Sequence, residues 1–141
     1  MSYQRPERKP TVLIVDDVAF VRTTLSAVLS QSGFEVVGEA SSGIEAMEQY
    51  ARLKPDVVTM DVVMPKMSGI EATKKIIKSF PGAKIVMISA MGQESLVMEA
   101  IHVGAKDYLI KPFSSHEVTK TLDHVLNDRT TPSGTHRTAG A

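Results

Sequence analysis

Five polar residues in this sequence stand in similar places, immediately after short runs of apolar residues. They are Asp16 with Asp17, Asp61, Ser89 and Lys111. Carboxylate, hydroxyl and ammonium groups together can hold a hard divalent cation beside an anionic group. If these side chains meet in one place, a phosphoryl group can lie between the carboxylates on one side and the hydroxyl and ammonium groups on the other.

The carboxylates of Asp16, Asp17 and Asp61 would need compensation of their charge, since like charges a few ångströms apart cannot all stay ionised. Mg²⁺ supplies it well, because Mg²⁺ favours sites with a few carboxylates and several retained waters. Lys111 is then suited to pair with a second anion, and the Ser89 hydroxyl to donate to a phosphoryl oxygen. If one carboxylate attacks phosphorus, the product is an acyl phosphate.

Each of these residues also has a simpler interpretation. An Asp-Asp pair after a strand is often a helix N-cap with a first-turn acid. A lone Asp61 or Ser89 is common in turns, and a Lys-Pro pair is common at a solvated strand end. The coincidence of suitable chemistry at four of five strand ends favours a shared site over these separate explanations.

The elements that must position these residues are short strands alternating with helices. The β-branched runs lie at Thr11–Val15, Glu35–Glu39, Asp56–Met60, Lys84–Ile88 and Asp107–Ile110. The gaps between them carry helical periodicity, as at Val21, Leu25, Val28 and Leu29. This alternation predicts an α/β fold: a doubly wound five-stranded parallel sheet in the order 2-1-3-4-5, with helices on both faces. Functional groups gather at the carboxyl ends of such strands.

Helix boundaries are also readable. The pairs Ser42 with Glu45 and Ser114 with Glu117 have the spacing of capping boxes. Gly33 and Gly104 stand where helix C-terminal stops are expected.

The chain of 141 residues has the length of one domain. Residues 1–10 contain two prolines and several charges, which predicts a flexible N-terminal arm. Residues 11–126 form the domain. Residues 127–141 are rich in Thr, Gly and Ser, which predicts a flexible tail or the stub of a linker to a further domain.

Composition excludes several classes of protein. The absence of cysteine excludes disulfide scaffolds, thiolate metal sites and cysteine nucleophiles. Lys+Arg and Asp+Glu both total 16, so the formal net charge of zero argues against a broad contact with nucleic acid or an anionic membrane. No apolar run is long enough to span a bilayer and no signal-peptide core is present, which predicts a soluble cytoplasmic protein. His102, His116 and His124 are predicted to be exposed on helices, and His136 lies in the tail.

The segments VLIVDD, VVTMDVVMPKMSG, IVMISA and GAKDYLIKPF resemble the receiver domains of two-component response regulators. The resemblance extends from Thr11 to about Leu126. Within that family the chain resembles the single-domain chemotaxis type, the CheY-like proteins, partly because so little follows the fifth helix. The fold implied is the flavodoxin-like receiver fold.

The resemblance implies a role for each site residue. Asp61 matches the phosphoacceptor. Asp16 and Asp17 match the acidic pair that holds Mg²⁺, with Asp17 and Asp61 as direct ligands, Asp16 acting through water, and the backbone carbonyl of Val63 completing the protein ligands. The protein would assist only its own phosphorylation and dephosphorylation, so the resemblance does not imply an enzyme with an external substrate.

The resemblance also implies a switch. Ser89 and Lys111 would contact the phosphoryl group, and Tyr108 would be the aromatic residue that moves inward when Ser89 moves. The Lys111–Pro112 peptide bond is expected to be cis.

The partners implied are a histidine kinase as phosphodonor, a downstream target protein, and a phosphatase. The target would bind the face made by the helix after Lys84–Ile88, the strand Asp107–Ile110 and the helix that follows it. We expect an apolar patch there from Val97, Ile101 and Tyr108, although helical spacing alone fits core positions for Val97 and Ile101 equally well.

Val63 and Met91 stand two residues after Asp61 and Ser89, where this family often carries polar groups that influence loss of the phosphoryl group. Neither apolar side chain can orient an attacking water, so we expect slow self-dephosphorylation.

Three alternatives remain. A Mg²⁺-dependent aspartyl phosphatase of the haloacid-dehalogenase type also uses a strand-end Asp, but it needs a second acid two residues later, and Val63 occupies that place. The second alternative is that the chain is the receiver half of a longer transcriptional or enzymatic regulator. The third is that it is an inactive receiver used as a scaffold.

Overall fold

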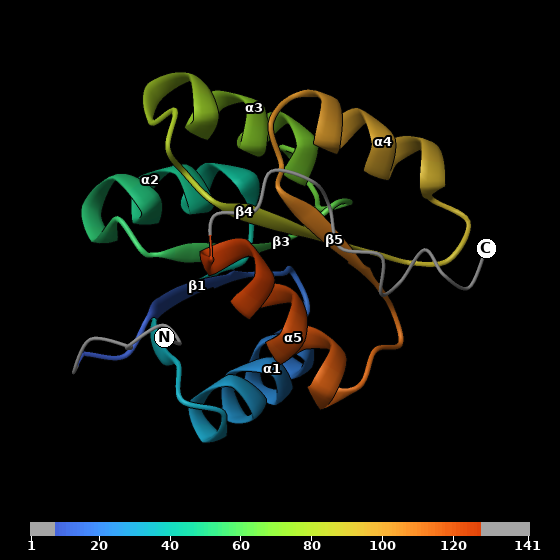
Figure 1. The fold of residues 1–141 in the computed structure, drawn as a ribbon. Helices are drawn as coiled ribbons and strands as arrows, with labels where there is room; N and C mark the ends of the chain where they lie inside the picture. Colours follow the sequence, from blue (N-terminus) through green and yellow to red (C-terminus); the bar gives the residue numbers. More distant parts are fainter. Residues whose placement is uncertain (1–7, 128–141) are drawn as a thin grey trace.

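The computed structural model describes residues 8–127, which form alternating strands and helices (Figure 1). In chain order these are β1 (Thr11–Val15), α1 (Ala19–Gln31), β2 (Glu35–Ala40), α2 (Gly43–Leu53), β3 (Val57–Asp61), α3 (Gly69–Ser79), β4 (Ile85–Ser89), α4 (Glu94–His102), β5 (Asp107–Ile110) and α5 (Ser115–Leu126).

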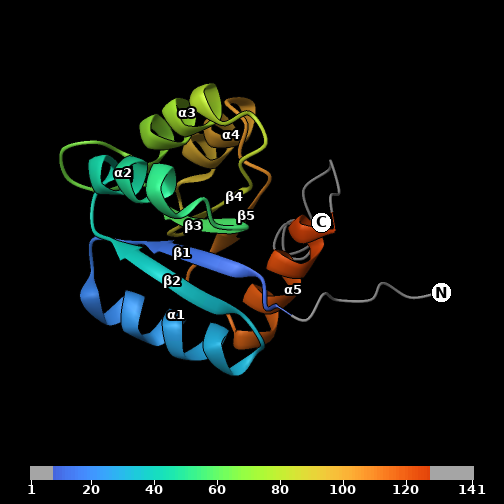
Figure 2. The same cartoon turned by 90° about the vertical axis from the view of Figure 1, so that its left-hand side faces the viewer.

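The strands form one parallel sheet in the order β2-β1-β3-β4-β5, which confirms the predicted topology. Helices α1 and α5 cover one face of the sheet, and α2, α3 and α4 cover the other (Figures 1 and 2). The three inner strands, β1, β3 and β4, are therefore covered on both faces, and this explains their nearly continuous apolar sequences.

The sheet divides the core into two apolar layers. Leu13 and Val15 of β1 belong to the layer under α2, α3 and α4, whereas Val12 and Ile14 belong to the layer against α1 and α5. This alternation follows from the period of two residues along a strand. Both layers contain residues that are fully buried, so the strand ends that carry the polar residues rest on a rigid base.

Two strands lie one residue later in the chain than predicted. The predicted strands were Asp56–Met60 and Lys84–Ile88, whereas β3 is Val57–Asp61 and β4 is Ile85–Ser89. In addition, β2 ends one residue later than predicted, at Ala40. Asp61 pairs with Ile88, and Ser89 with Ile110. Two of the site residues are therefore fixed by the hydrogen bonding of the sheet itself.

Serine side chains cap the N-termini of several helices. Ser114 and Glu117 form the complete capping box that their spacing predicts. Ser42 accepts from the backbone N–H of Glu45, but the Glu45 carboxylate accepts from Ser41 instead, so this box is only half formed.

The two predicted helix stops are confirmed. Gly33 and Gly104 adopt φ of 93° and 125°, in the left-handed region that glycine tolerates best, and each follows the C-cap residue of its helix, α1 or α4.

The two ends of the chain lie largely outside the described residues. The predicted arm at 1–10 is described only from Arg8, and the predicted tail at 127–141 only at Asn127. Within residues 8–127, no helix combines the length and the apolar character needed to cross a membrane.

Candidate functional site

The carboxyl edge of the sheet brings the predicted polar residues into one region. Asp61 and Ser89 are the last residues of β3 and β4, while Asp16 with Asp17 follows β1 and Lys111 follows β5. Because β1, β3, β4 and β5 are consecutive neighbours in a parallel sheet, their ends share one edge.

Asp16, Asp17 and Asp61 form the acidic centre of this edge. Each offers one carboxylate oxygen, and these oxygens all lie within 4.8 Å of one another. Asp16 and Asp61 are buried, with 1% and 8% of their surface exposed, whereas Asp17 is exposed. A set of three carboxylates, open on one side to water, fits the ligand preference of Mg²⁺ for a few carboxylates and retained waters.

Asp16 is held at several atoms. Its backbone N–H donates to the carbonyl of Ala40 at 3.0 Å, and its Oδ1 accepts from the backbone N–H of Val18 at 2.9 Å. The N-cap of α1 is Val18, with no side-chain cap. The alternative in which the Asp-Asp pair serves as the N-cap of α1 is therefore wrong.

Lys111 reaches back into the acidic centre from the end of β5. Its Nζ lies 3.3 Å from Oδ2 of Asp16 and 4.0 Å from Oδ1 of Asp61. Its backbone N–H donates to the carbonyl of Ser89 at 2.8 Å, and the Lys111–Pro112 bond is cis, as predicted. The ammonium group thus lies beside Asp61 while it is hydrogen-bonded to Asp16.

The charges of this centre act on Asp61 most strongly. Burial raises the pKa of Asp61 from its ordinary value of 3.8 to about 7, and the negative charges of Asp16 and Asp17 contribute in the same direction. The positive charge of Lys111 opposes the shift without cancelling it. The centre is therefore short of positive charge, which is the condition that favours a bound cation.

The loop after Asp61 turns tightly against that residue. The backbone N–H of Gly69 donates to the carbonyl of Val62 at 2.9 Å. A Cβ at Gly69 would lie 1.9 Å from the carbonyl oxygen of Asp61, so no other residue fits without moving the backbone. Val63, in the same loop, is 52% exposed, and Met91 after β4 is 74% exposed.

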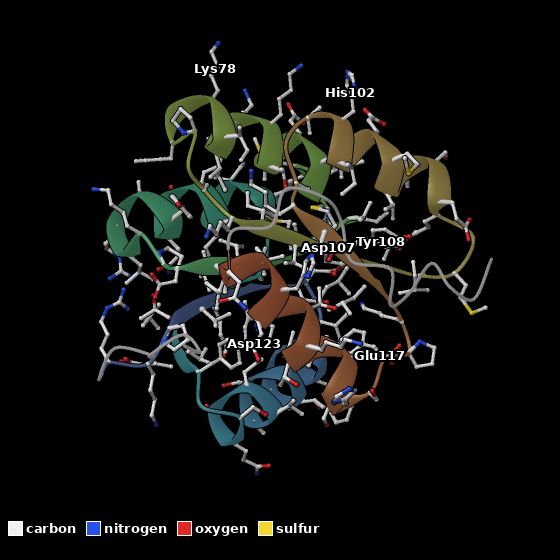
Figure 3. All side chains as sticks on the ribbon, viewed as in Figure 1. Lys78, His102, Asp107, Tyr108, Glu117 and Asp123 are labelled. Atoms are coloured by element: carbon white, nitrogen blue, oxygen red, sulfur yellow. The ribbon has the colours of Figure 1, made fainter. Side chains whose placement is uncertain are left out.

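Ser89 and Tyr108 differ in how the structure places them. Ser89 is fully buried, and its hydroxyl donates to the carbonyl of Ala90 at 3.3 Å rather than to a carboxylate of the centre. Tyr108 is half-buried on β5 and packs against the core layer under α3 and α4 (Figure 3).

Of the two positions that the sequence left open for Val97, an apolar surface patch and the core, the structure shows the core. Val97 is only 2% exposed and belongs to the core, while Ile101 and Tyr108 are partly buried against it. The exposed apolar residue of α4 is Met98, at 62%. The outcome depends on helical phase, and the sequence does not show which side of α4 meets the sheet.

The histidines lie outside this centre. His102 is exposed and points away from the sheet on α4 (Figure 3), and His116 is also exposed. His124 is half-buried, contrary to expectation, and His136 lies outside the described residues.

Sequence reasoning missed Arg22. Its Nη1 donates to the carbonyl oxygen of Asp16 at 2.7 Å, and its Nε donates to Oε1 of Glu39 at 3.0 Å. A bond to a backbone carbonyl leaves no pattern in the sequence, so an arginine on the first turns of α1 gives no sign of it.

Comparison with known proteins agrees with this geometry. Residues 12–123 match the family described as the response regulator receiver domain. The chain is 54% identical to the chemotaxis protein CheY of Thermotoga maritima over 114 residues, which are 81% of this chain and 95% of that protein.

Solved structures give the same result. The response regulator domain of Thermotoga maritima CheB superposes with a TM-score of 0.79 at 37% identity, over 86% of this chain and 99% of that one. A CheY from Borrelia burgdorferi, solved as a CheX-CheY-BeF3-Mg²⁺ complex, superposes with a TM-score of 0.78 at 36% identity, over 82% and 87% of the two chains. Sequence, topology and the arrangement of the strand ends lead to one conclusion: this chain belongs to the family of response regulator receiver domains.

Proposed function

We propose that this protein is a phosphorylation-activated response regulator of a chemotaxis-type two-component system, with Asp61 as its phosphoacceptor. The observation that carries the proposal is the placement of Asp61, which is buried at the end of β3 among the carboxylates of Asp16 and Asp17, with Lys111 at 4.0 Å. The CheY of Thermotoga maritima supports the chemotaxis branch, because it is 54% identical and the match covers 95% of that protein.

Mg²⁺ is the cofactor that we propose for this centre. Asp17, Asp61 and the backbone carbonyl of Val63 would hold it directly, and Asp16 would hold it through water. When bound, Mg²⁺ supplies positive charge that offsets the repulsion among the carboxylates and draws phosphoryl oxygens into place. The Mg²⁺ named in the solved Borrelia burgdorferi complex supports this choice.

The remaining residues orient the phosphoryl group. An oxygen of the Asp61 carboxylate attacks phosphorus in line, the P–N bond to the donor histidine breaks, and the imidazole leaves with the bonding electron pair and then takes up a proton. Lys111, whose ammonium group lies 3.3 Å from Oδ2 of Asp16 in the free protein, pairs with a phosphoryl oxygen once Asp61 is phosphorylated.

Activation follows from the new charge on Asp61. The Ser89 hydroxyl turns from the carbonyl of Ala90 towards the phosphoryl group, and Tyr108 moves into the space that Ser89 leaves. The face made by α4, β5 and α5 then changes shape and binds a downstream target protein. The donor is a histidine kinase in the cytoplasm, and a separate phosphatase removes the phosphoryl group, because Val63 and Met91 do not activate water.

Two other functions are less well supported. An aspartyl phosphatase would need an acid at the position of Val63, which is an exposed apolar residue. The second is a receiver that forms part of a longer regulator, and the observation in its favour is the likeness to the response regulator domain of CheB.

The test is intact-mass spectrometry after incubation with acetyl phosphate, with and without Mg²⁺. The wild type should gain one phosphoryl group only when Mg²⁺ is present, with release of acetate. Asp61→Asn should gain none, and Asp123→Asn, which changes an exposed aspartate on α5, should behave as the wild type. An adduct on Asp61→Asn, or none on the wild type, would contradict the proposal.

A further inference from the structure

Arg22 joins the acidic loop to the edge of the sheet. It lies on α1, donates from Nη1 to the carbonyl oxygen of Asp16 at 2.7 Å, and donates from Nε to the carboxylate of Glu39 on β2 at 3.0 Å. Its side chain is only 19% exposed. A single planar guanidinium group therefore fixes the loop after β1 against two other elements.

The carbonyl that Arg22 holds belongs to the peptide between Asp16 and Asp17. The orientation of that peptide sets the direction in which Asp17 leaves the backbone. Asp16 has further restraints, from Val18 on Oδ1 and from Lys111 on Oδ2. Among residues 8–127, no donor bonds to the exposed Asp17 carboxylate, so this side chain depends on its backbone for its position.

We infer that Arg22 is a positioning residue for cation binding, and that it acts by fixing the Asp16–Asp17 peptide so that Asp17 points into the acidic centre. The inference rests on the proposed function, because it takes Asp17 as a Mg²⁺ ligand. Glu39 supports this role, because its carboxylate accepts a hydrogen bond from Arg22 and balances its charge.

The charge of Arg22 and its hydrogen bond to the backbone should affect Mg²⁺ affinity in opposite directions, and this makes the inference testable. A positive charge near three carboxylates opposes the binding of a cation, so removal of the Arg22 charge alone should tighten Mg²⁺ binding. Loss of the hydrogen bond to the carbonyl of Asp16 should weaken it. Supporting groups outside the ligand set typically contribute about tenfold or more to metal affinity.

The experiment measures the Mg²⁺ dissociation constant of the unphosphorylated protein by calorimetric titration. Arg22→Met removes the charge and the hydrogen bonds, and we expect its dissociation constant to rise about tenfold. Arg22→Lys keeps the charge, but one ammonium group cannot reproduce the planar fork of guanidinium donors, so we expect a rise here too. The matched control is Arg52→Met on α2, which lies outside the acidic centre and should bind as the wild type.

Thermal unfolding of each variant in EDTA gives the second readout. A merely structural arginine would lower the unfolding temperature and leave the Mg²⁺ affinity of the folded protein unchanged. Unchanged or tighter binding by Arg22→Met, or wild-type binding by Arg22→Lys, overturns the inference and leaves the proposed function intact. If the wild type itself does not bind Mg²⁺, both the proposed cofactor and this inference are wrong.

Discussion

Asp61 is held in the structure at a cost to stability. Its pKa of about 7, against an ordinary value of 3.8, means that the folded protein binds a proton there which the unfolded chain releases. Between those two values the folded state holds more protons, so its stability falls as the pH rises. Above about pH 7 the full cost is present, and below about pH 4 it is absent.

Asp61→Asn should therefore stabilise the protein at about pH 8 without Mg²⁺, because it removes one of the clustered charges. We expect about 1–2 kcal/mol, a figure reduced for the water that reaches the site, and almost no difference at about pH 4. Urea unfolding at both pH values measures it. Glu48→Gln, an exposed change of equal charge on α2, should show no such trend, and a variant less stable than the wild type at the higher pH would refute the argument.

Val63 and Met91 set the expected lifetime of the phosphoryl group. Both are exposed beside the site, at 52% and 74%, and neither carries a group that can hold a water molecule for attack. Val63→Asn should shorten the lifetime of the phosphoryl group by about tenfold. This is less than the usual rate enhancement by a positioned acid or base, because an amide can orient water but does not take its proton. The measurement is the decay of the phosphorylated species after removal of the donor. Ile44→Asn, at another exposed apolar residue on the same edge, is the control and should leave the decay unchanged.

At the scale of the elements, Asp56 ties the start of β1 to the start of β3 at the opposite edge of the sheet. Its Oδ2 accepts from the backbone N–H of Thr11 at 2.7 Å and from the Thr11 hydroxyl at 3.1 Å. Arg8 adds an ion pair at 2.8 Å. The hydrogen bond from Arg8 and those from Thr11 lower the pKa of Asp56 despite its partial burial.

A lowered pKa means that this carboxylate contributes stability above its ordinary pKa and loses the contribution as the pH falls through the lower, folded value. Asp56→Asn should cost about 1 kcal/mol near neutral pH and progressively less below about pH 4. Arg8→Gln should cost less, since the Arg8 side chain is 65% exposed. Chemical unfolding across this range tests the order of the two variants, and an Asp56→Asn loss that does not shrink in acid would show that the carboxylate charge is not responsible.

At the scale of the whole molecule, a cation at the acidic centre joins β1 to β3 in the middle of the sheet. Mg²⁺ should therefore raise the unfolding temperature, and at ten times its dissociation constant the gain is about 1.4 kcal/mol. EDTA should reverse the shift, and NaCl at matched ionic strength should not produce it. An equal shift in Asp17→Asn would place the cation elsewhere.

Much of this molecule could be predicted from its sequence. The alternation of β-branched runs with helical periodicity predicts five parallel strands and the edge where the polar residues meet. The predicted ends of β3 and β4 are one residue early, because Asp61 and Ser89 are polar in sequence but paired within the sheet. The extent to which Lys111 favours Asp16 over Asp61 could not be read from spacing at all.

The points that the sequence left open or missed share a physical origin. For Val97 the spacing allowed both an apolar surface patch and a core position, and the structure shows the core position, because the rotation of α4 about its axis depends on packing against α3 and β4. Arg22 was missed because its partner is a backbone carbonyl, and all residues have one. Sequence patterns predict which elements form, whereas contacts between elements decide what each side chain does.

The distribution of the helices has a consequence for how far a change at Asp61 extends. The strand ends at the acidic centre lead into α1 and α5 on one face of the sheet and into α3 and α4 on the other (Figure 2). A single chemical event at Asp61 is thus connected to both sides of the molecule through short loops. A change at Asp61 is therefore not confined to one face of the sheet, because loops that begin beside it lead to helices on both faces.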